Sequence, residues 1–212
     1  MVTPDSFPAG FGSGLIAKLH AEGTKKQPHQ CGKLPFLIRK DGSWLYKGSV
    51  IRRKPMVCLF ASALRRAADG IFWLRTPVEE GTIEVEDAPF VVTELNWRGT
   101  GREQTLCFRT NVDAVITAGP EYPLRTQWDV PLDACDSATP PYLTVRAGEG
   151  PLPVEARISR PVWYELAALA EPGCYCGQPC LGVWSGGVFF PLARAPRGCP
   201  DANIPDCDDD TP

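Results

Sequence analysis

The feature that most constrains this chain is an internal repeat that returns after 107 residues. An apolar stretch ending in arginine, a glycine-containing turn and two aliphatic positions each occur twice at this spacing. The first copies are residues 36–39, the turn at 41–43, Ile51 and Leu59, and the second are residues 143–146, the turn at 148–150, Ile158 and Leu166. A spacing this long exceeds that of solenoid repeats and indicates a duplicated domain.

The repeat also predicts where the two copies differ. Residues 70–73 are echoed by residues 187–190, which lie 117 positions later rather than 107. We therefore expect a Cys-rich insertion at 172–181 in the second copy.

Each copy predicts a short strand, a turn, an extended piece, a helix and another strand. Pro55 and Pro161 suit the first turn of a helix, because proline has a fixed φ and no N–H to satisfy there. The first helix is expected to end by Gly70 and the second at residues 171–173. The predicted fold class is α+β: two related units from an internal duplication, each with one main helix and mostly antiparallel, short-stranded sheets.

Between the copies, residues 83–86, 90–97 and 104–110 alternate as half-buried strands, the last two joined in a hairpin. The predicted organisation therefore has four parts. They are an N-terminal arm at 1–30 with at most one short helix at 14–22, a first domain at 31–130, a second domain at 131–195, and an acidic, disordered tail at 196–212.

Charge and composition exclude several classes of partner. The formal net charge is −3, so binding to nucleic acid or an anionic membrane through bulk charge is not expected. The chain has no apolar stretch of about 20 residues, which excludes insertion into a membrane. The first residues lack the pattern of a secretory signal, so a cytoplasmic protein is predicted. Nine cysteines, an odd number, then favour free thiols or metal ligands over disulfides.

Common enzyme signatures are missing from the sequence. It contains no nucleophile elbow, phosphate-binding loop, dinucleotide fingerprint or zinc-protease motif. The two histidines, His20 and His29, both precede the repeat. This pattern favours a protein that is not an enzyme, with an unrecognised enzyme as the weaker interpretation.

A cysteine cluster in the second copy suggests a metal site. Cys174, Cys176 and Cys180 lie within seven residues, and Cys199 or Cys207 can supply the fourth thiolate of a structural zinc site. The spacing departs from the usual pairs of C-x2-C, so two alternatives stay open. The cluster is either a loop of ordinary thiols or a redox-sensing group.

Several charged residues are candidates for contacts with a ligand. Asp87 follows Glu84 and Glu86 and can present a carboxylate to a ribose hydroxyl, although the two glutamates also suit a solvated strand face. Arg65 and Arg66 can bind phosphate or simply oppose a helix dipole. Further arginines that can contact phosphate are Arg39, Arg109 and Arg125.

Two polar turns are also candidates. Thr110 and Asn111 end a predicted strand, where they can bind a ligand or close an Asx turn. Trp184 and Ser185 lie in a glycine-rich stretch that suits stacking and phosphate contact, or a β-turn beside a core tryptophan.

An ordered series of short motifs resembles the bacterial domain-of-unknown-function family 1285. The resemblance covers about residues 30–194, and each motif alone is short. The motifs are residues 31–32, 41–44, 59–66, 69–70, 76–79, 85–90, 110–112, 118–120, 122–124 and 182–187. Two residues depart from the family pattern: Lys33 replaces an acidic residue and Arg52 replaces glycine.

The resemblance implies a duplicated two-domain fold whose second half is similar to pleckstrin-homology domains. It also implies a pocket between the halves for a nucleotide-like ligand and a role in signal transduction with a signalling partner. We expect this cleft to be lined by Glu79, Asp87, Arg109, Thr110, Asn111, Trp184 and Ser185. The alternative is a protein-interaction adaptor without a small-molecule ligand, which uses sheet edges or the cysteine loop.

Overall fold

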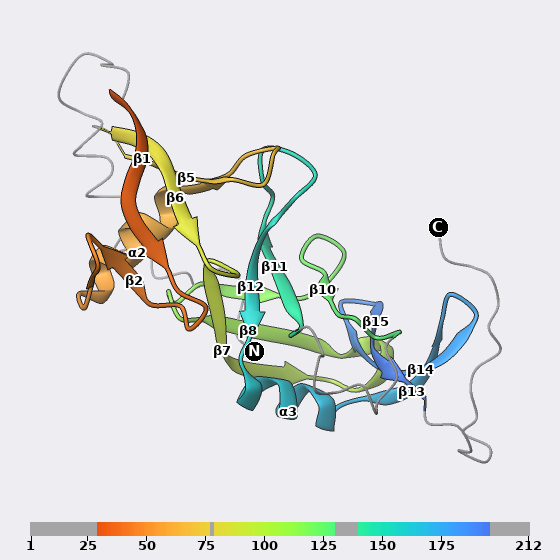
Figure 1. Ribbon diagram of the computed structural model, residues 1–212. Helices are drawn as coiled ribbons and strands as arrows, with labels where there is room; N and C mark the ends of the chain where they lie inside the picture. The colour runs from red at the N-terminus through yellow and green to blue at the C-terminus, as the bar shows by residue number, and fades with distance from the viewer. Residues whose placement is uncertain (1–28, 77–78, 130–139, 196–212) are drawn as a thin grey trace.

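The computed structural model describes residues 29–76, 79–129 and 140–195 (Figure 1). The expected helix at 14–22 and the acidic tail lie outside these ranges. His29 and Gln30, the last residues of the expected arm, begin the first strand. Neither helix in the described residues is long and apolar enough to cross a membrane.

The first unit is a six-stranded sheet with one helix. Its strands lie in the order β3-β2-β1-β6-β5-β4, and only the central pair, β1 and β6, is parallel. The elements are β1 (His29–Ile38), β2 (Trp44–Tyr46), β3 (Ser49–Val50), α2 (Lys54–Ala63), β4 (Leu64–Arg66), β5 (Phe72–Arg75) and β6 (Glu79–Val85).

The second unit contains another six-stranded sheet, in the order β10-β11-β12-β7-β8-β9. Its elements are β7 (Phe90–Arg98), η1 (Gly101–Glu103), β8 (Thr105–Thr110), β9 (Val115–Thr117), β10 (Leu124–Arg125), β11 (Tyr142–Arg146) and β12 (Val154–Ile158). Helix α3 (Arg160–Ala168) contacts β7. An antiparallel sheet of β13 (Glu171–Tyr175), β14 (Gln178–Ser185) and β15 (Val188–Arg194) follows.

The two large sheets have the same connectivity. The central parallel pair is β1 and β6 in the first sheet and β7 and β12 in the second. These are the first and the last of six consecutive strands in each case, and all other neighbouring strands are antiparallel. This confirms the predicted α+β class with two similar units. The expected boundary at residue 130 falls inside the second sheet, because β12 crosses back to pair with β7. Local strand patterns do not reveal such a long-range pairing. The predicted boundary therefore assigns β7–β9 to the first domain, whereas they belong to the second sheet.

The turn glycines show how the two copies of the sequence repeat correspond. Gly70 precedes β5 with φ of 88°, and Gly177 precedes β14, 107 residues later, with φ of 70°. Residues 172–181 are therefore part of the β13–β14 hairpin, which the 107-residue repeat aligns with β4–β5, rather than an insertion. This alignment differs from the match between the two large sheets, in which β4–β5 corresponds to β10–β11. The apparent offset of 117 arises because β5 and β15 both place aromatic residues just after a turn glycine.

Both helices begin as predicted, with proline in the first turn. Helix α2 ends earlier than expected, at Ala63, because Leu64 begins strand β4. Its apolar side chains are only partly covered: Ala61 is its one buried residue, whereas Met56 and Leu59 are exposed.

A single hydrophobic core runs through both units. Ile38, Trp44 and Leu74 of the first unit belong to the same buried cluster as Phe90 and Leu166 of the second. Because the units share this core, they hold each other in place, and residues at their junction are positioned by both.

Candidate functional site

The candidate site lies where the β4–β5 turn of the first unit meets the β11–β12 loop of the second (Figure 1). Several hydrogen bonds cross this junction, among them two that involve Arg66. The backbone N–H of Glu149 donates to the carbonyl oxygen of Arg66 at 2.8 Å, and Nη1 of Arg66 donates to the carbonyl oxygen of Pro153 at 2.6 Å. Two adjoining hollows open here, and Arg66 lines both.

The larger hollow has a volume of about 290 Å³ and is strongly cationic. Its charged side chains are three guanidinium groups and one carboxylate. The lining residues are Arg65, Arg66, Arg146, Ala147, Gly148, Glu149 and Val154. Arginine guanidinium groups form paired hydrogen bonds with phosphate and carboxylate, so this hollow suits an anion.

Arg146 connects β11 to the end of helix α2. Its Nη2 donates to the carbonyl oxygens of Ala61 and Leu64, both at 2.8 Å, at the C-terminal end of α2. The Ala61 carbonyl also accepts the backbone N–H of Leu64. Burial lowers the pKa of Arg146, and the charge of Arg65 lowers it further. Its Nε is buried and has no hydrogen-bond partner among the described residues.

Arg65 also interacts with the end of α2. Its Nη1 donates to the carbonyl oxygens of Ser62 at 3.2 Å and Leu64 at 3.0 Å. The interpretation of Arg65 as a cation that opposes the helix dipole therefore holds, and it coexists with a position on the wall of the larger hollow.

Arg66 lies between the two hollows. Its guanidinium stacks over the ring of Phe72, 5.2 Å from the centroid, and its Nη1 is 3.8 Å from Oε2 of Glu155. Its Nε, like that of Arg146, is buried without a partner in the described part of the chain. Nε1 of Trp44 and Nε of Arg157 are buried in the same way without a hydrogen-bond partner in this part of the chain, so the feature is not specific to the larger hollow.

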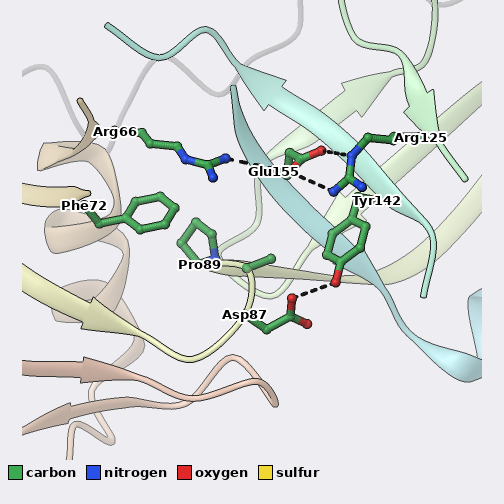
Figure 2. Close-up of a pocket in the computed structure, with 8 residues that line it drawn as sticks. Arg66, Phe72, Asp87, Pro89, Arg125, Tyr142 and Glu155 are labelled. Atoms are coloured by element: carbon green, nitrogen blue, oxygen red, sulfur yellow. Dashed lines mark hydrogen bonds and ion pairs between the residues drawn. The ribbon is translucent and has the colours of Figure 1, made fainter. Parts of the chain in front are cut away.

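The smaller hollow, of about 150 Å³, is shown in Figure 2. Its lining residues are Arg66, Phe72, Asp87, Ala88, Pro89, Arg125, Tyr142 and Glu155. Nε and Nη2 of Arg125 donate to the two carboxylate oxygens of Glu155 at 2.7 and 3.0 Å, and this pairing raises the pKa of Arg125. The same guanidinium lies 4.4 Å from the ring centroid of Tyr142. The charges of the smaller hollow are therefore largely paired with one another.

Tyr142 and Asp87 form the other polar contact of the smaller hollow. The Tyr142 hydroxyl donates to Oδ1 of Asp87 at 2.6 Å, and Nε of Arg157 is 3.6 Å from Oδ2 (Figure 2 shows the first contact). Burial, followed by the hydrogen bond to Asp87, raises the pKa of Tyr142 to about 12. A tyrosine this weakly acidic stays protonated near neutral pH and serves as a hydrogen-bond donor rather than as a base.

Of the seven expected ligand residues, only Asp87 lines either hollow. Glu79 begins β6 and is exposed, and its backbone N–H donates to the hydroxyl of Thr76 at 3.0 Å. Arg109 is exposed on β8 and pairs with Glu94, with 3.0 Å between Nε and Oε2. Neither residue is part of the junction.

Thr110 and Asn111 form structural hydrogen bonds. The buried Thr110 hydroxyl accepts the backbone N–H of Ala114 at 3.2 Å, which closes the β8–β9 turn. Asn111 bonds to the backbone of Val91 and Gly42. Thr110 therefore has the turn-forming role, whereas the Asn111 side chain bonds to segments 20 and 69 residues away and closes no Asx turn.

Trp184 and Ser185 also serve the interior of the second unit. Ser185 is fully buried, where its hydroxyl accepts the backbone N–H of Leu106 at 2.9 Å and donates to the carbonyl oxygen of Ala118 at 2.7 Å. Trp184 packs edge-on against Phe189, with Arg102 5.1 Å from its ring centroid. Both of these side chains are thus occupied within the fold.

The cysteines of the expected zinc site are in different states. Cys174 is disulfide-bonded, contrary to the expectation of free thiols, whereas Cys176 is an exposed free thiol and Cys180 a buried one. Cys199, the fourth expected ligand, lies outside the described residues. Within the described ranges, no group of three or more His, Cys, Asp or Glu side chains is placed to hold a metal ion. A disulfide sulfur is not the thiolate that zinc requires, so Cys174 does not fit the expected role as it stands.

Arg146, Tyr142 and Glu155 are not among the residues predicted from the sequence. A signal existed for Arg146, which is the repeat counterpart of Arg39 and ends strand β11. Tyr142 and Glu155 alternate with apolar residues on β11 and β12, as do many solvated side chains. Only the junction with the first unit distinguishes them.

Comparison with known proteins supports the two-unit description. Residues 24–88 match the N-terminal "domain of unknown function (DUF1285)", and residues 89–192 match the C-terminal domain of the "protein of unknown function (DUF1285)". The division between the matches, at residues 88 and 89, coincides with the division between the two large sheets. No curated protein matches the chain.

Two solved structures are similar to this chain. A DUF1285 family protein from Silicibacter pomeroyi DSS-3 is 38% identical, with a TM-score of 0.65, and the match covers 84% of this chain and 94% of that one. A DUF1285 family protein from Shewanella baltica OS155 is 24% identical, with a TM-score of 0.45, over 62% of this chain and 89% of that one.

Proposed function

We propose, from the premise that this chain belongs to the DUF1285 family, that it is a non-catalytic binding protein of the cytoplasm. Its ligand is a nucleotide-like phosphorylated molecule bound at the junction of the two units. Occupancy of that site controls a signalling partner. The observation that carries the proposal is the convergence of Arg65, Arg66 and Arg146 on one hollow that contains a single carboxylate.

The size and chemistry of the hollow support a small anionic ligand. Ligand pockets usually occupy about 300–1,000 Å³, and the larger hollow, at about 290 Å³, is just below that range and suits only a small ligand. Charge-assisted hydrogen bonds between guanidinium and phosphate contribute about 1.5–3 kcal/mol each.

The position of the hollow supports a regulatory role. Its arginines come from both units, and the bonds from Arg66 and Glu149 cross the junction. A ligand that contacts both units stabilises one relative arrangement of them over others. The link to a signalling partner is supported by the family resemblance, which implies that role.

Isothermal titration calorimetry with ADP as the probe tests this proposal. We expect ADP to bind the wild-type chain, and Arg65→Ala to weaken binding about tenfold through loss of a charged hydrogen bond. Arg65 is exposed and its hydrogen bonds are local, so the variant should fold. Arg109→Ala removes the same charge far from the hollow and should change the affinity less than about twofold.

Two results would contradict the proposal. One is the absence of ADP binding at millimolar concentration. The other is an equal loss of affinity in Arg65→Ala and Arg109→Ala, which would show that binding depends on overall charge rather than on the hollow. Thermal unfolding of each variant confirms that the comparison is made between folded proteins.

A second candidate function, an interaction adaptor, is favoured by the exposed apolar side chains of helix α2. Met56 is 42% exposed and Leu59 is 40% exposed, on a helix with only one buried residue. Exposed apolar groups of this kind occur at protein interfaces. A photo-crosslinking residue in place of Leu59 should then give an adduct of defined mass in cells, while the same residue in place of the exposed Tyr164 on α3 should not. Equal crosslinking at the two positions would exclude a specific surface.

A further inference from the structure

We infer that the junction site recognises its ligand through the phosphate group alone and makes no specific contact with the base of a nucleotide. This inference rests on the proposed function and specifies the class of compound that the site accepts. Nucleotides with different bases, and inorganic pyrophosphate, should then bind with similar affinity.

The first step concerns where an anion binds. The larger hollow has three guanidinium groups and only the carboxylate of Glu149. The smaller hollow has two guanidinium groups, of Arg66 and Arg125, and two carboxylates, of Asp87 and Glu155. A phosphate is therefore attracted to the larger hollow and finds a balanced set of charges in the smaller one.

The second step concerns which donors are available there. Within the described residues Arg146 donates hydrogen bonds through Nη2 only, although a guanidinium carries five N–H donors. Arg66 likewise uses only Nη1 there, toward Pro153 and Glu155. Nη1 of Arg146 and Nη2 of Arg66 therefore make no hydrogen bond within the described residues, and a phosphate oxygen is an acceptor for such donors. The Nε atoms of both arginines are too buried to contact a molecule in the hollow.

The third step concerns the base. No aromatic side chain lines the larger hollow in the described part of the chain. The smaller hollow contains two rings, of Phe72 and Tyr142, but a guanidinium lies over each of them at 5.2 and 4.4 Å from the centroid.

The polar groups near these rings are also occupied. The Tyr142 hydroxyl donates to Asp87, and both carboxylate oxygens of Glu155 accept from Arg125. Recognition of a base requires a free stacking face and unpaired donors or acceptors at its edge. The side chains around the smaller hollow use these groups on one another, so the base gains no specific contact (Figure 2).

Calorimetric titrations of the full chain with pyrophosphate, ADP, GDP and adenosine, at one ionic strength, test the inference. We expect the dissociation constants of the three phosphorylated compounds to agree within about threefold, a difference of less than about 1 kcal/mol. Adenosine should not bind. Arg65→Ala should weaken all three phosphorylated compounds by the same factor, whereas Arg109→Ala should leave them unchanged.

The outcomes separate this inference from the proposed function. If ADP binds at least about tenfold more tightly than GDP and pyrophosphate, or if adenosine binds, then the base is read and the inference is wrong while the junction site stands. If none of the phosphorylated compounds binds, both the inference and the proposed function are wrong. Similar binding that Arg65→Ala does not weaken would place the phosphate elsewhere and would also overturn the inference.

Discussion

Asn111 joins the two units through Gly42: its Nδ2 donates to the carbonyl oxygen of Gly42 at 3.1 Å. The Oδ1 of the same side chain accepts the backbone N–H of Val91 at 3.0 Å. One amide group therefore connects the β1–β2 turn to strand β7 and to the end of β8. This contact explains why an asparagine, with both a donor and an acceptor, occupies the position.

Asn111→Ala should destabilise the protein, because it leaves two partly buried backbone groups without their partner. The expected loss is about 1–3 kcal/mol in the free energy of unfolding. Urea unfolding monitored by tryptophan fluorescence measures it. The control, Asn96→Ala on β7, removes an exposed amide and should change the free energy by less than about 0.5 kcal/mol. Equal effects of the two variants would contradict a linking role for Asn111.

Gly42→Ala should disturb the same contact from the other side. Gly42 has φ of 84°, and a Cβ there would lie 2.6 Å from Nδ2 of Asn111. Gly48→Ala is the matched control, because Gly48 has φ of 79° but a Cβ at that position would have no neighbouring atom within 4 Å. In both variants alanine must adopt a positive φ, which costs about 1–2 kcal/mol. Any additional loss in the free energy of unfolding of Gly42→Ala, relative to Gly48→Ala, measures the steric contact with Asn111. If Gly48→Ala lowers the free energy of unfolding at least as much as Gly42→Ala does, the steric contact with Asn111 does not affect stability.

Stability at alkaline pH should depend on Tyr142. Its pKa is raised to about 12 in the folded protein, above the value of about 10 for an unfolded chain. Between these values the unfolded state loses the hydroxyl proton while the folded state keeps it, so the stabilising contribution is present below about pH 10 and falls as the pH rises toward about 12. The urea concentration at the unfolding midpoint should therefore fall less between about pH 9 and pH 11 in Tyr142→Phe than in the wild type. Tyr164→Phe, at an exposed tyrosine, should behave as the wild type does.

The two free thiols of the β13–β14 hairpin should differ in reactivity. Cys176 is exposed, whereas Cys180 is buried and its pKa is raised, chiefly by burial. A raised pKa reduces the thiolate fraction, and the thiolate is the reactive form. Iodoacetamide at about pH 8 should thus modify Cys176 at least about tenfold faster than Cys180, as measured by peptide mass spectrometry. Comparable rates in the folded protein would show that Cys180 is accessible, and denaturation should abolish the difference.

Local features of the chain were predictable because neighbouring residues encode them. Pro55 and Pro161 each lie in the first turn of a helix, and the hairpin between β7 and β8 forms around Gly99 and Gly101, both with positive φ. The α+β class follows from these elements.

The candidate site was less predictable. Arg65 and Arg66 carried two interpretations in the sequence, as phosphate ligands and as cations at a helix end, and the structure gives Arg65 a place in both. Ser185 and Asn111 were candidates because short polar residues at turns suit either a ligand or the backbone. In the structure, both side chains form hydrogen bonds with backbone groups of the fold.

The sequence by itself therefore determined where both helices begin and the β7–β8 hairpin, since each depends on residues a few positions apart. It also contains the repeated pattern. The tertiary structure decided which distant segments meet. β12 pairs with β7 although β8–β11 lie between them in the chain, and Arg146 reaches the end of α2 to complete a cationic hollow with Arg65 and Arg66. Such meetings depend on how two whole sheets pack around one shared core, and no local spacing encodes that packing.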